Sequence, residues 1–400
     1  MYDSAPLVDT PPDPRVQACV VVPVRDEEEG VAAALAALAK QVDAAGAPLD
    51  PATYEVIVLA NNCTDHTAAV ARSVGQADFP LLRLHVVEKT LAADQAHVVR
   101  ARQVLMDDAY RRLRLVGTPR GVIASTDGDT RVSPRWLSAT LAAVAAGADA
   151  VGGRIVVDRT DLEIMDEGAR ALYRWDTLYR LLAARLEARL DPDPADPWPR
   201  HHQYFGGSLA VTAAAYALVG GLPSVPSLED IAFHRLLERA DARVRRSPAV
   251  RVTTSGRRSA RVAVGLSTQL GTWARMRADS QPCLVESAAS LEALFGARRA
   301  LRLLWLSARA DGALDHTALA ALATALCVDA ATLRQAVSSS PTFGVLWDAV
   351  REAQHRDGVD RWTRRWPLQE VEDAAHTLRV ILTRSPRRSE LRWGTFLKQI

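Results

Sequence analysis

Apolar segments of strand length alternate with helical patterns over the first third of the chain. The strand-length segments, each dominated by apolar residues, are 18–23, 54–60, 82–87 and 121–126. Between them, apolar residues recur at helical spacing over about 28–42, from about 64, and over about 93–114. Strands that alternate with helices are typical of βαβ units, so this part of the chain predicts an α/β fold with a mostly parallel sheet flanked by helices.

The pattern changes in the second half of the chain. Apolar residues three or four positions apart, or at twice that spacing, predict one long helix over 163–190. It ends in DPDPADPWPR, where four prolines in ten residues require a loop. Beyond about residue 280 the strand patterns stop and helical spacing continues. We therefore expect a disordered, proline-rich tail over 1–16, an α/β domain over 17–281 and an all-α C-terminal domain over 282–400.

Composition narrows the classes of protein that fit. The formal net charge of +2 is too small to favour nucleic acid or a membrane surface as a partner. The four cysteines are widely spaced, which argues against a zinc site or a disulfide framework and favours a reducing cytoplasm. No segment approaches the roughly 18 apolar residues of a membrane span. The start, MYDSAPLVDTPPDP, lacks the apolar centre of a signal peptide, so we expect a soluble cytoplasmic protein.

Two carboxylates follow the apolar segment 121–126. Asp127 and Asp129 are separated by Gly128, and side chains two positions apart on a strand lie on the same side. Ligands of open parallel sheets bind at the carboxyl ends of the strands. A divalent cation that also binds substrate phosphates would relieve the repulsion between the two carboxylates. A surface Asp-Gly turn is the alternative, whereas a calcium loop does not fit because Arg131 occupies the fifth ligand position.

Polar clusters also follow the first two strand-length segments, as PVRDEEE at 23–29 and NNCTD at 61–65. Three predicted strand ends would thus carry polar side chains at the edge where such a fold binds its ligand. The first strand is not followed by GxGxxG, which disfavours a dinucleotide-dependent dehydrogenase.

VVPVRDEEE, VIVLANNCTDHT, ASTDGDTRVSPRW and LED at 228–230 resemble, in this order, the motifs of family 2 of the glycosyltransferases. The resemblance covers roughly residues 17–275 and extends distantly to enzymes like glucosyl-3-phosphoglycerate synthase. It implies the GT-A fold, which has a Rossmann-like, mostly parallel sheet. It also implies a metal-dependent, inverting hexosyltransferase that uses a nucleotide-sugar donor, with a UDP-sugar favoured over a GDP-sugar.

The resemblance assigns donor contacts to the strand ends, namely to Pro23, Arg25, Asp26, Glu27, Asn61 and Asp127. Asp127 and Asp129 would bind the divalent cation, Mg²⁺ or Mn²⁺, with Asp129 favoured as the direct ligand. Asn61 stands where the family usually has an aspartate that contacts a pyrimidine. Because an amide both donates and accepts hydrogen bonds, contact with the base is retained and the identity of the base stays open.

The resemblance makes Asp230 the general base that accepts the proton of an acceptor hydroxyl, with Glu229 as the alternative. Attack from the face opposite the nucleotide would invert the configuration of the sugar. The residues themselves also allow a structural role, since Ser227 and Asp230 have the spacing of a capping box at the start of a helix.

Seven arginines and no acid occur over 243–261. Nucleic-acid binding is disfavoured because no aromatic residue is interleaved for base stacking. Related enzymes grip the diphosphate in this region, so the resemblance assigns that role to Arg257, Arg258 and Arg261, whose guanidinium groups suit phosphate oxygens.

Two other functions are compatible with the sequence: a nucleotidyltransferase, and a catalytically inactive GT-A protein whose helical C-terminal region docks a partner. For a transferase, the acceptor is a small molecule or a lipid-linked one, and the C-terminal region covers the acceptor cleft or forms a contact in a homo-oligomer. The sequence leaves these alternatives open.

Overall fold

The computed structural model describes residues 6–256, 266–355 and 360–384. Contacts divide the chain into two compact units: a first unit of residues 1–161 and 203–256, and a second unit of 162–202 and 257–400. The long helix near 163–190 thus groups with the C-terminal helices. The domain boundary that the sequence suggests at 281 differs from this division and stays a prediction.

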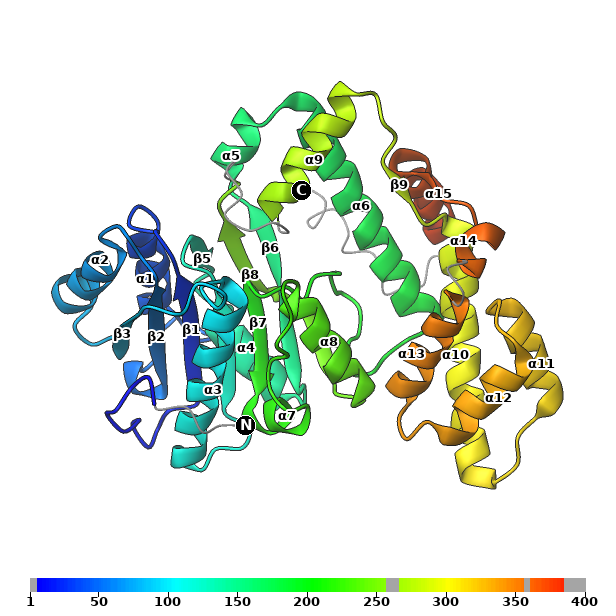
Figure 1. Cartoon of the computed structure of the whole chain (residues 1–400), viewed down its shortest axis with the longest axis horizontal. Helices are drawn as coiled ribbons and strands as arrows, with labels where there is room; N and C mark the ends of the chain where they lie inside the picture. The colour runs from blue at the N-terminus through cyan, green and yellow to red at the C-terminus, as the bar shows by residue number, and fades with distance from the viewer. Residues whose placement is uncertain (1–5, 257–265, 356–359, 385–400) are drawn as a thin grey trace. The chain divides into compact units, whose positions relative to one another are not determined.

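The first unit is built on a sheet with the strand order β3-β2-β1-β4-β7-β6-β8-β5 (Figure 1). The strands are β1 (Ala18–Val24), β2 (Tyr54–Asn61), β3 (Leu84–Lys89), β4 (Val122–Thr126), β5 (Thr130–Val132), β6 (Ala150–Val157), β7 (Ser208–Thr212) and β8 (Val244–Thr254). The neighbours among β1–β4 pair in parallel, whereas β7 runs antiparallel to both β4 and β6. The four predicted strands are confirmed, with ends within two residues of those expected.

Helices cover both faces of this sheet. They are α1 (Val31–Ala39), α2 (Thr67–Ser73), α3 (Val98–Val116), α4 (Trp136–Ala145), α7 (Ala213–Leu218) and α8 (Glu229–Arg239), with α5 (Arg159–Ile164) at the unit boundary. Successive residues of β1 alternate between two cores: Val20 and Val22 pack with α1, α2 and α4, whereas Cys19 and Val21 pack with α3, α7 and α8. Burial on both faces explains the near-continuous apolar strands.

Composition predicts a disordered tail over 1–16, but the described part of it, residues 6–16, is packed against the rest of the first unit. Val8 is buried, and the backbone N–H of Leu7 donates to Asp108 on α3 at 3.2 Å. Arg112 of α3 donates to the carbonyl oxygen of Thr10 at 2.7 Å and forms a two-pronged ion pair with Glu55, with both N–O distances 2.6 Å. These side chains of α3 satisfy backbone groups of the segment, which composition alone does not reveal.

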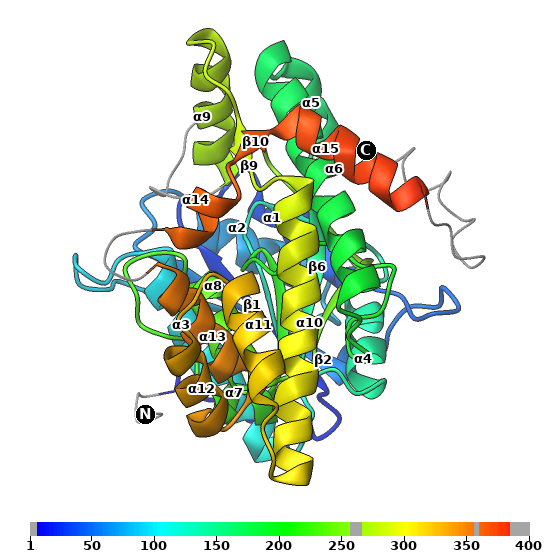
Figure 2. The ribbon, with the colours of Figure 1, turned by 90° about the vertical axis from the view of Figure 1, so that its right-hand side faces the viewer.

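The second unit is helical. Its helices are α6 (Glu167–Leu190), α9 (Leu266–Ala278), α10 (Ala288–Asp311), α11 (His316–Ala325), α12 (Ala330–Ser339), α13 (Phe343–Gln354), α14 (Arg361–Arg365) and α15 (Val371–Thr383) (Figure 2). A short antiparallel ribbon of β9 (Leu284–Val285) and β10 (Gln369–Glu370) corrects the expectation that no strands follow residue 280. The helical C-terminal region itself is confirmed.

The long helix α6 begins where the side chain of Asp166 accepts a hydrogen bond from the N–H of Ala169, at 3.0 Å. Just after its last residue, buried Asp191 accepts hydrogen bonds from Arg298 at 2.5 Å and from Arg302 at 3.0 Å, both on α10.

Among the described helices, none alone has the length and apolar composition to cross a membrane. Helices α11 and α12 have that length and composition only when taken together, and the pair is bent by 115°.

Candidate active site

The carboxylates of Asp127 and Asp129 lie where two chain segments meet. β4 ends at Thr126, which pairs with Ser208 at the start of β7. Because β7 is antiparallel to β4, the residues that precede β7 lie beside those that follow β4. A Cβ at Gly207 would lie 3.0 Å from Oδ2 of Asp127, so this glycine allows the backbone to approach the carboxylate.

Gly128 has a steric role between the two carboxylates. A Cβ built on it would lie 2.5 Å from Cγ1 of Val24, a buried residue at the end of β1. The glycine therefore lets the turn pack directly against β1. The side chain of Asp127 is 38% exposed and Asp129 is also half-buried, so both carboxylates are open to a ligand.

Arg102 of α3 is a residue of this site that the motifs do not indicate. It is 4% exposed, and its guanidinium donates to Oγ of Ser125 at 3.1 Å, to Oδ1 of Asp127 at 2.6 Å and to Oε1 of Glu229. The pKa of Asp127 is raised, chiefly by burial. The positive charge of Arg102 lowers this pKa, whereas the negative charges of Asp129 and Glu229 raise it further. Burial disfavours the charge of Arg102, but the surrounding carboxylates, Asp127 foremost, raise its pKa.

Glu229 and Asp230 open helix α8 but have different surroundings. Glu229 is 4% exposed and bonded to Arg102. Asp230 is half-buried, and its Oδ2 accepts a hydrogen bond from the N–H of Gly206 at 2.8 Å. The capping box with Ser227 is wrong: the residue before the helix is Leu228, in a left-handed conformation with φ of 58°, and no side chain caps the helix.

The residues that follow β1 form hydrogen bonds with the residues that follow β2. Oδ1 of Asp26 accepts from the N–H of Thr64 at 2.6 Å, and the N–H of Glu27 donates to Oγ1 of Thr67 at 2.7 Å. Arg25 is exposed and donates to the carbonyl oxygen of Ala96 at 2.8 Å. Pro23 is buried within β1, opposite Leu59 of β2.

Asn61, the last residue of β2, is 2% exposed. Its Oδ1 has no hydrogen-bond partner among the described residues. A buried acceptor without a partner costs free energy, so the position suits a ligand group that donates a hydrogen bond.

Residues 19–197 match the sequence model of glycosyl transferase family 2. The chain carries a family 2 glycosyltransferase domain. This match and the observed sheet confirm the predicted GT-A fold and glycosyltransferase class. None of the curated protein sequences compared with the chain matches it.

Solved glycosyltransferases align with this chain at low identity. The mannosyltransferase PcManGT from Pyrobaculum calidifontis, in complex with GDP-Man and Mn²⁺, is 18% identical, with 95% of this chain and 90% of that chain covered and a TM-score of 0.39. S. aureus TarS 1–349 in complex with UDP-GlcNAc is 16% identical, with 88% and 92% covered and a TM-score of 0.43. Glucosyl-3-phosphoglycerate synthase from Mycobacterium tuberculosis, in complex with Mn²⁺, UDP and phosphoglyceric acid, is 17% identical, with 67% and 80% covered and a TM-score of 0.34.

Within the family 2 glycosyltransferase domain, a second group of side chains has the spacing of metal ligands. Among the described residues, single ligand atoms of Asp26, Cys63 and Asp65 lie within 4.8 Å of one another. Local hydrogen bonds use both carboxylates; those to Asp65 come from Thr67 and from the N–H of Glu28. Burial raises the pKa of the Cys63 thiol, which disfavours the thiolate that a metal requires. These side chains are therefore better explained as a loop-to-loop contact.

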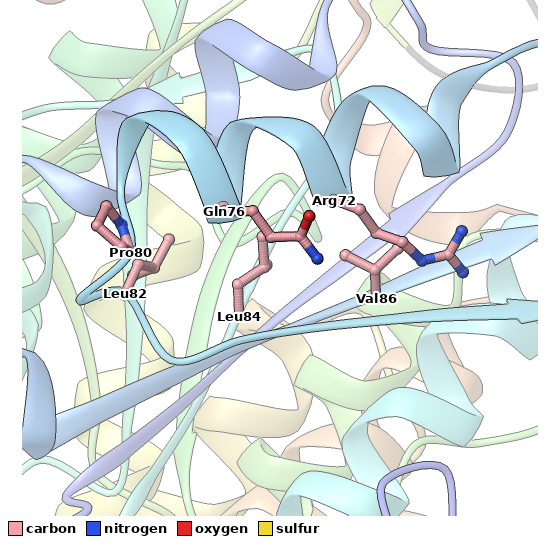
Figure 3. Close-up of a pocket in the computed structure, with 7 residues that line it drawn as sticks. Arg72, Gln76, Pro80, Leu82, Leu84 and Val86 are labelled. Atoms are coloured by element: carbon pink, nitrogen blue, oxygen red, sulfur yellow. The ribbon is translucent and has the colours of Figure 1, made fainter.

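Arg257, Arg258 and Arg261, the predicted diphosphate contacts, lie outside the described residues. A pocket of about 440 Å³ opens beside β3 (Figure 3). It is lined by Arg72, Gly75, Gln76, Pro80, Leu82, Leu84 and Val86 and includes none of the candidate site residues.

Proposed function

We propose that this family 2 domain transfers a hexosyl group from a nucleoside-diphosphate sugar to a hydroxyl group of an acceptor, with inversion at the anomeric carbon. A UDP-sugar is the favoured donor. The observation that carries the proposal is that the carboxylate of Asp127 lies beside Gly207, and that the N–H of the adjacent Gly206 donates a hydrogen bond to Asp230. This proximity supports the proposal that Asp127 and Asp129 bind the cation and that Asp230 is the base.

Asp127 and Asp129 supply the metal site. Both are partly exposed carboxylates, and carboxylate oxygens are ligands that Mg²⁺ and Mn²⁺ prefer. The cation, when bound, neutralises charge on the diphosphate as it leaves. Arg102 compensates part of the charge of Asp127. The preference for Asp129 as the direct ligand comes from the family resemblance and stays a prediction.

Asp230 rather than Glu229 is the general base. Glu229 is buried and its carboxylate is engaged by Arg102, so an acceptor has no access to it. Asp230 is more exposed and is oriented by the N–H of Gly206. The acceptor hydroxyl gives its proton to Asp230, its oxygen bonds to the anomeric carbon, and the bond from that carbon to the diphosphate breaks, with the electron pair leaving on the nucleoside diphosphate.

The nucleotide occupies the ends of β1 and β2. The unpaired Oδ1 of Asn61 supports a contact with a base N–H, such as N3–H of uracil. Arg25, Asp26 and Glu27, on the adjoining loop, and Pro23 remain proposed donor contacts. The assignment of Arg257, Arg258 and Arg261 to the diphosphate stays a prediction, as does the class of acceptor, a small molecule or a lipid-linked one.

Release of nucleoside diphosphate from a panel of UDP-sugars and GDP-mannose, with Mn²⁺ present and water as the acceptor, tests this function. We expect one donor to be hydrolysed by the wild type and Asp230→Asn to lower the rate at least 100-fold. Asp43→Asn is the matched control, because Asp43 is half-buried and also accepts backbone hydrogen bonds, from Ala45 and Ala47, both at 2.9 Å. Equal rates for the wild type and Asp230→Asn would refute the proposed base, and no release from any donor would refute the function.

A further inference from the structure

Arg102 connects three elements around the candidate site. It lies on α3, and its single guanidinium donates to Ser125 on β4, to Asp127 just after β4 and to Glu229 at the start of α8. We propose that Arg102 is a positioning residue, which fixes the donor-side carboxylate of Asp127 relative to the base-bearing helix α8. This inference rests on the proposed glycosyl transfer and concerns a residue outside the four sequence motifs that resemble the family.

The first link from Arg102 to the base passes through Glu229. This residue is the immediate neighbour of Asp230 on α8, and its buried carboxylate accepts from Nη1 of Arg102, while Nη2 reaches Asp127. A planar guanidinium holds several acceptors at fixed mutual angles, which an ammonium group does not. The orientation of the first turn of α8 is therefore tied to the position of Asp127.

The second link passes through Gly206. A Cβ at this position would lie 2.7 Å from Cζ of Arg102, so the loop backbone rests directly on the guanidinium. The N–H of the same residue donates to Oδ2 of Asp230 at 2.8 Å. Arg102 thus sets the position of the very backbone group that orients the base.

A role in stability alone is a weaker explanation for this ion pair. Replacing a buried pair by apolar side chains of similar volume often leaves stability unchanged or increases it. The pair also forms at the end of the sheet that carries Asp127 and Asp230, whereas the other buried pair of α3, Arg112 with Glu55, lies at the start of β2. The two pairs offer a comparison between a positioning role and a structural one.

The first test compares Arg102→Lys with Arg112→Lys in hydrolysis of the donor that the wild type turns over. For Arg102→Lys we expect kcat to fall at least tenfold, with the KM for the donor changed less than threefold, because lysine keeps the charge but not the fixed geometry. Arg112→Lys should lower the melting temperature but leave kcat within twofold. Equal effects of both variants on kcat, or an Arg102→Lys kcat within threefold of the wild type, would overturn the inference.

The second test separates positioning from folding with the double variant Arg102→Met/Glu229→Leu, which removes both buried charges together. We expect a melting temperature close to that of the wild type and a kcat still lowered at least tenfold. Recovery of kcat together with stability would overturn the inference, since the pair would then be structural. A wild-type protein that releases no nucleoside diphosphate from any donor would instead refute the proposed function, and the inference with it.

Discussion

The backbone N–H of Gly206 donates a hydrogen bond to Oδ2 of Asp230 at 2.8 Å, while the other side of this glycine faces the guanidinium of Arg102. One residue without a side chain therefore contacts both the candidate base and the arginine that orders its surroundings. The glycine is needed for its small size, because any Cβ would meet Cζ of Arg102 at 2.7 Å.

Gly206→Ala should damage both stability and turnover. Arg102 is held by three acceptors and has no free direction of movement, so the methyl group must displace the loop or break those bonds. We expect a loss of about 1–3 kcal/mol in the free energy of unfolding, as is usual for overpacking, and a lower rate of donor hydrolysis.

The control for this variant is Gly296→Ala. Gly296 lies in helix α10, and a Cβ there would meet no atom within 4 Å. Alanine should stabilise that helix by about 0.5–1 kcal/mol. Urea denaturation and the hydrolysis assay measure both variants, and wild-type behaviour of Gly206→Ala would contradict the geometry described for Arg102.

Gly128→Ala tests why a glycine separates the two carboxylates. The added methyl group would lie 2.5 Å from Cγ1 of Val24, so the turn that carries Asp127 and Asp129 has to move away from β1. We expect the Mn²⁺ concentration needed for half-maximal donor hydrolysis to rise several-fold.

Val24→Ala should rescue Gly128→Ala, since it removes the atom that the new methyl group meets. Contacting residues commonly show interaction energies of about 0.5–3 kcal/mol, and the double variant should be more stable than the sum of the two single changes allows. Additive effects on the urea midpoint, with no recovery of the Mn²⁺ requirement, would show that the methyl group acts elsewhere.

Much of the fold follows from local pattern. The strands β1, β2 and β4 are buried on both faces and so appear as apolar runs. The apolar stripe over 163–190 predicts α6, but the single helix expected there is interrupted, because α5 ends at Ile164 and α6 begins at Glu167. The pairing of β4 with β7 is different, because these strands lie some 80 residues apart in the chain and no local pattern encodes their contact. The proximity of Asp127 to the glycine just before β7 therefore could not be predicted from the sequence and was found only in the structure.

Arg102 did leave a signal in the sequence. Counted along α3, it stands three residues before Leu105 and seven before Ala109, so it occupies the stripe that faces the core. An arginine on an apolar stripe requires buried partners, although their identity depends on tertiary contacts with β4 and α8. The capping box at Ser227 failed because the helix begins one residue later than its spacing requires, after Leu228 in a left-handed conformation.

The buried pair of Glu55 and Arg112 predicts a pH dependence of stability. Burial alone would raise the pKa of Glu55, but hydrogen bonds from Arg112, His85 and Cys19 outweigh it and lower the pKa from 4.5 to about 2. The folded-state pKa is depressed, so the stabilisation is fully present above about pH 4.5 and is lost as the pH falls toward 2.

Glu55→Gln removes this titration. At pH 6 the variant should be less stable than the wild type, and the difference should shrink by about 3 kcal/mol as the pH falls from 4.5 to 2, because one pKa unit corresponds to about 1.4 kcal/mol. Urea denaturation across this range measures the difference. A gap that stays constant with pH would mean that Glu55 titrates alike in the folded and unfolded chains.

In the proposed function, the site formed by Asp127, Asp129 and Asp230 binds a nucleoside diphosphate together with a divalent cation. The most direct test is the melting temperature of the wild type and of Asp129→Asn with UDP, GDP and ADP, each with and without Mn²⁺ or Mg²⁺. A ligand that binds only the folded state raises this temperature. We expect one diphosphate, UDP by preference, to stabilise the wild type only when the cation is present, and we expect this stabilisation to be lost in Asp129→Asn. Wild-type protein that no nucleoside diphosphate stabilises with either cation would contradict the proposed function.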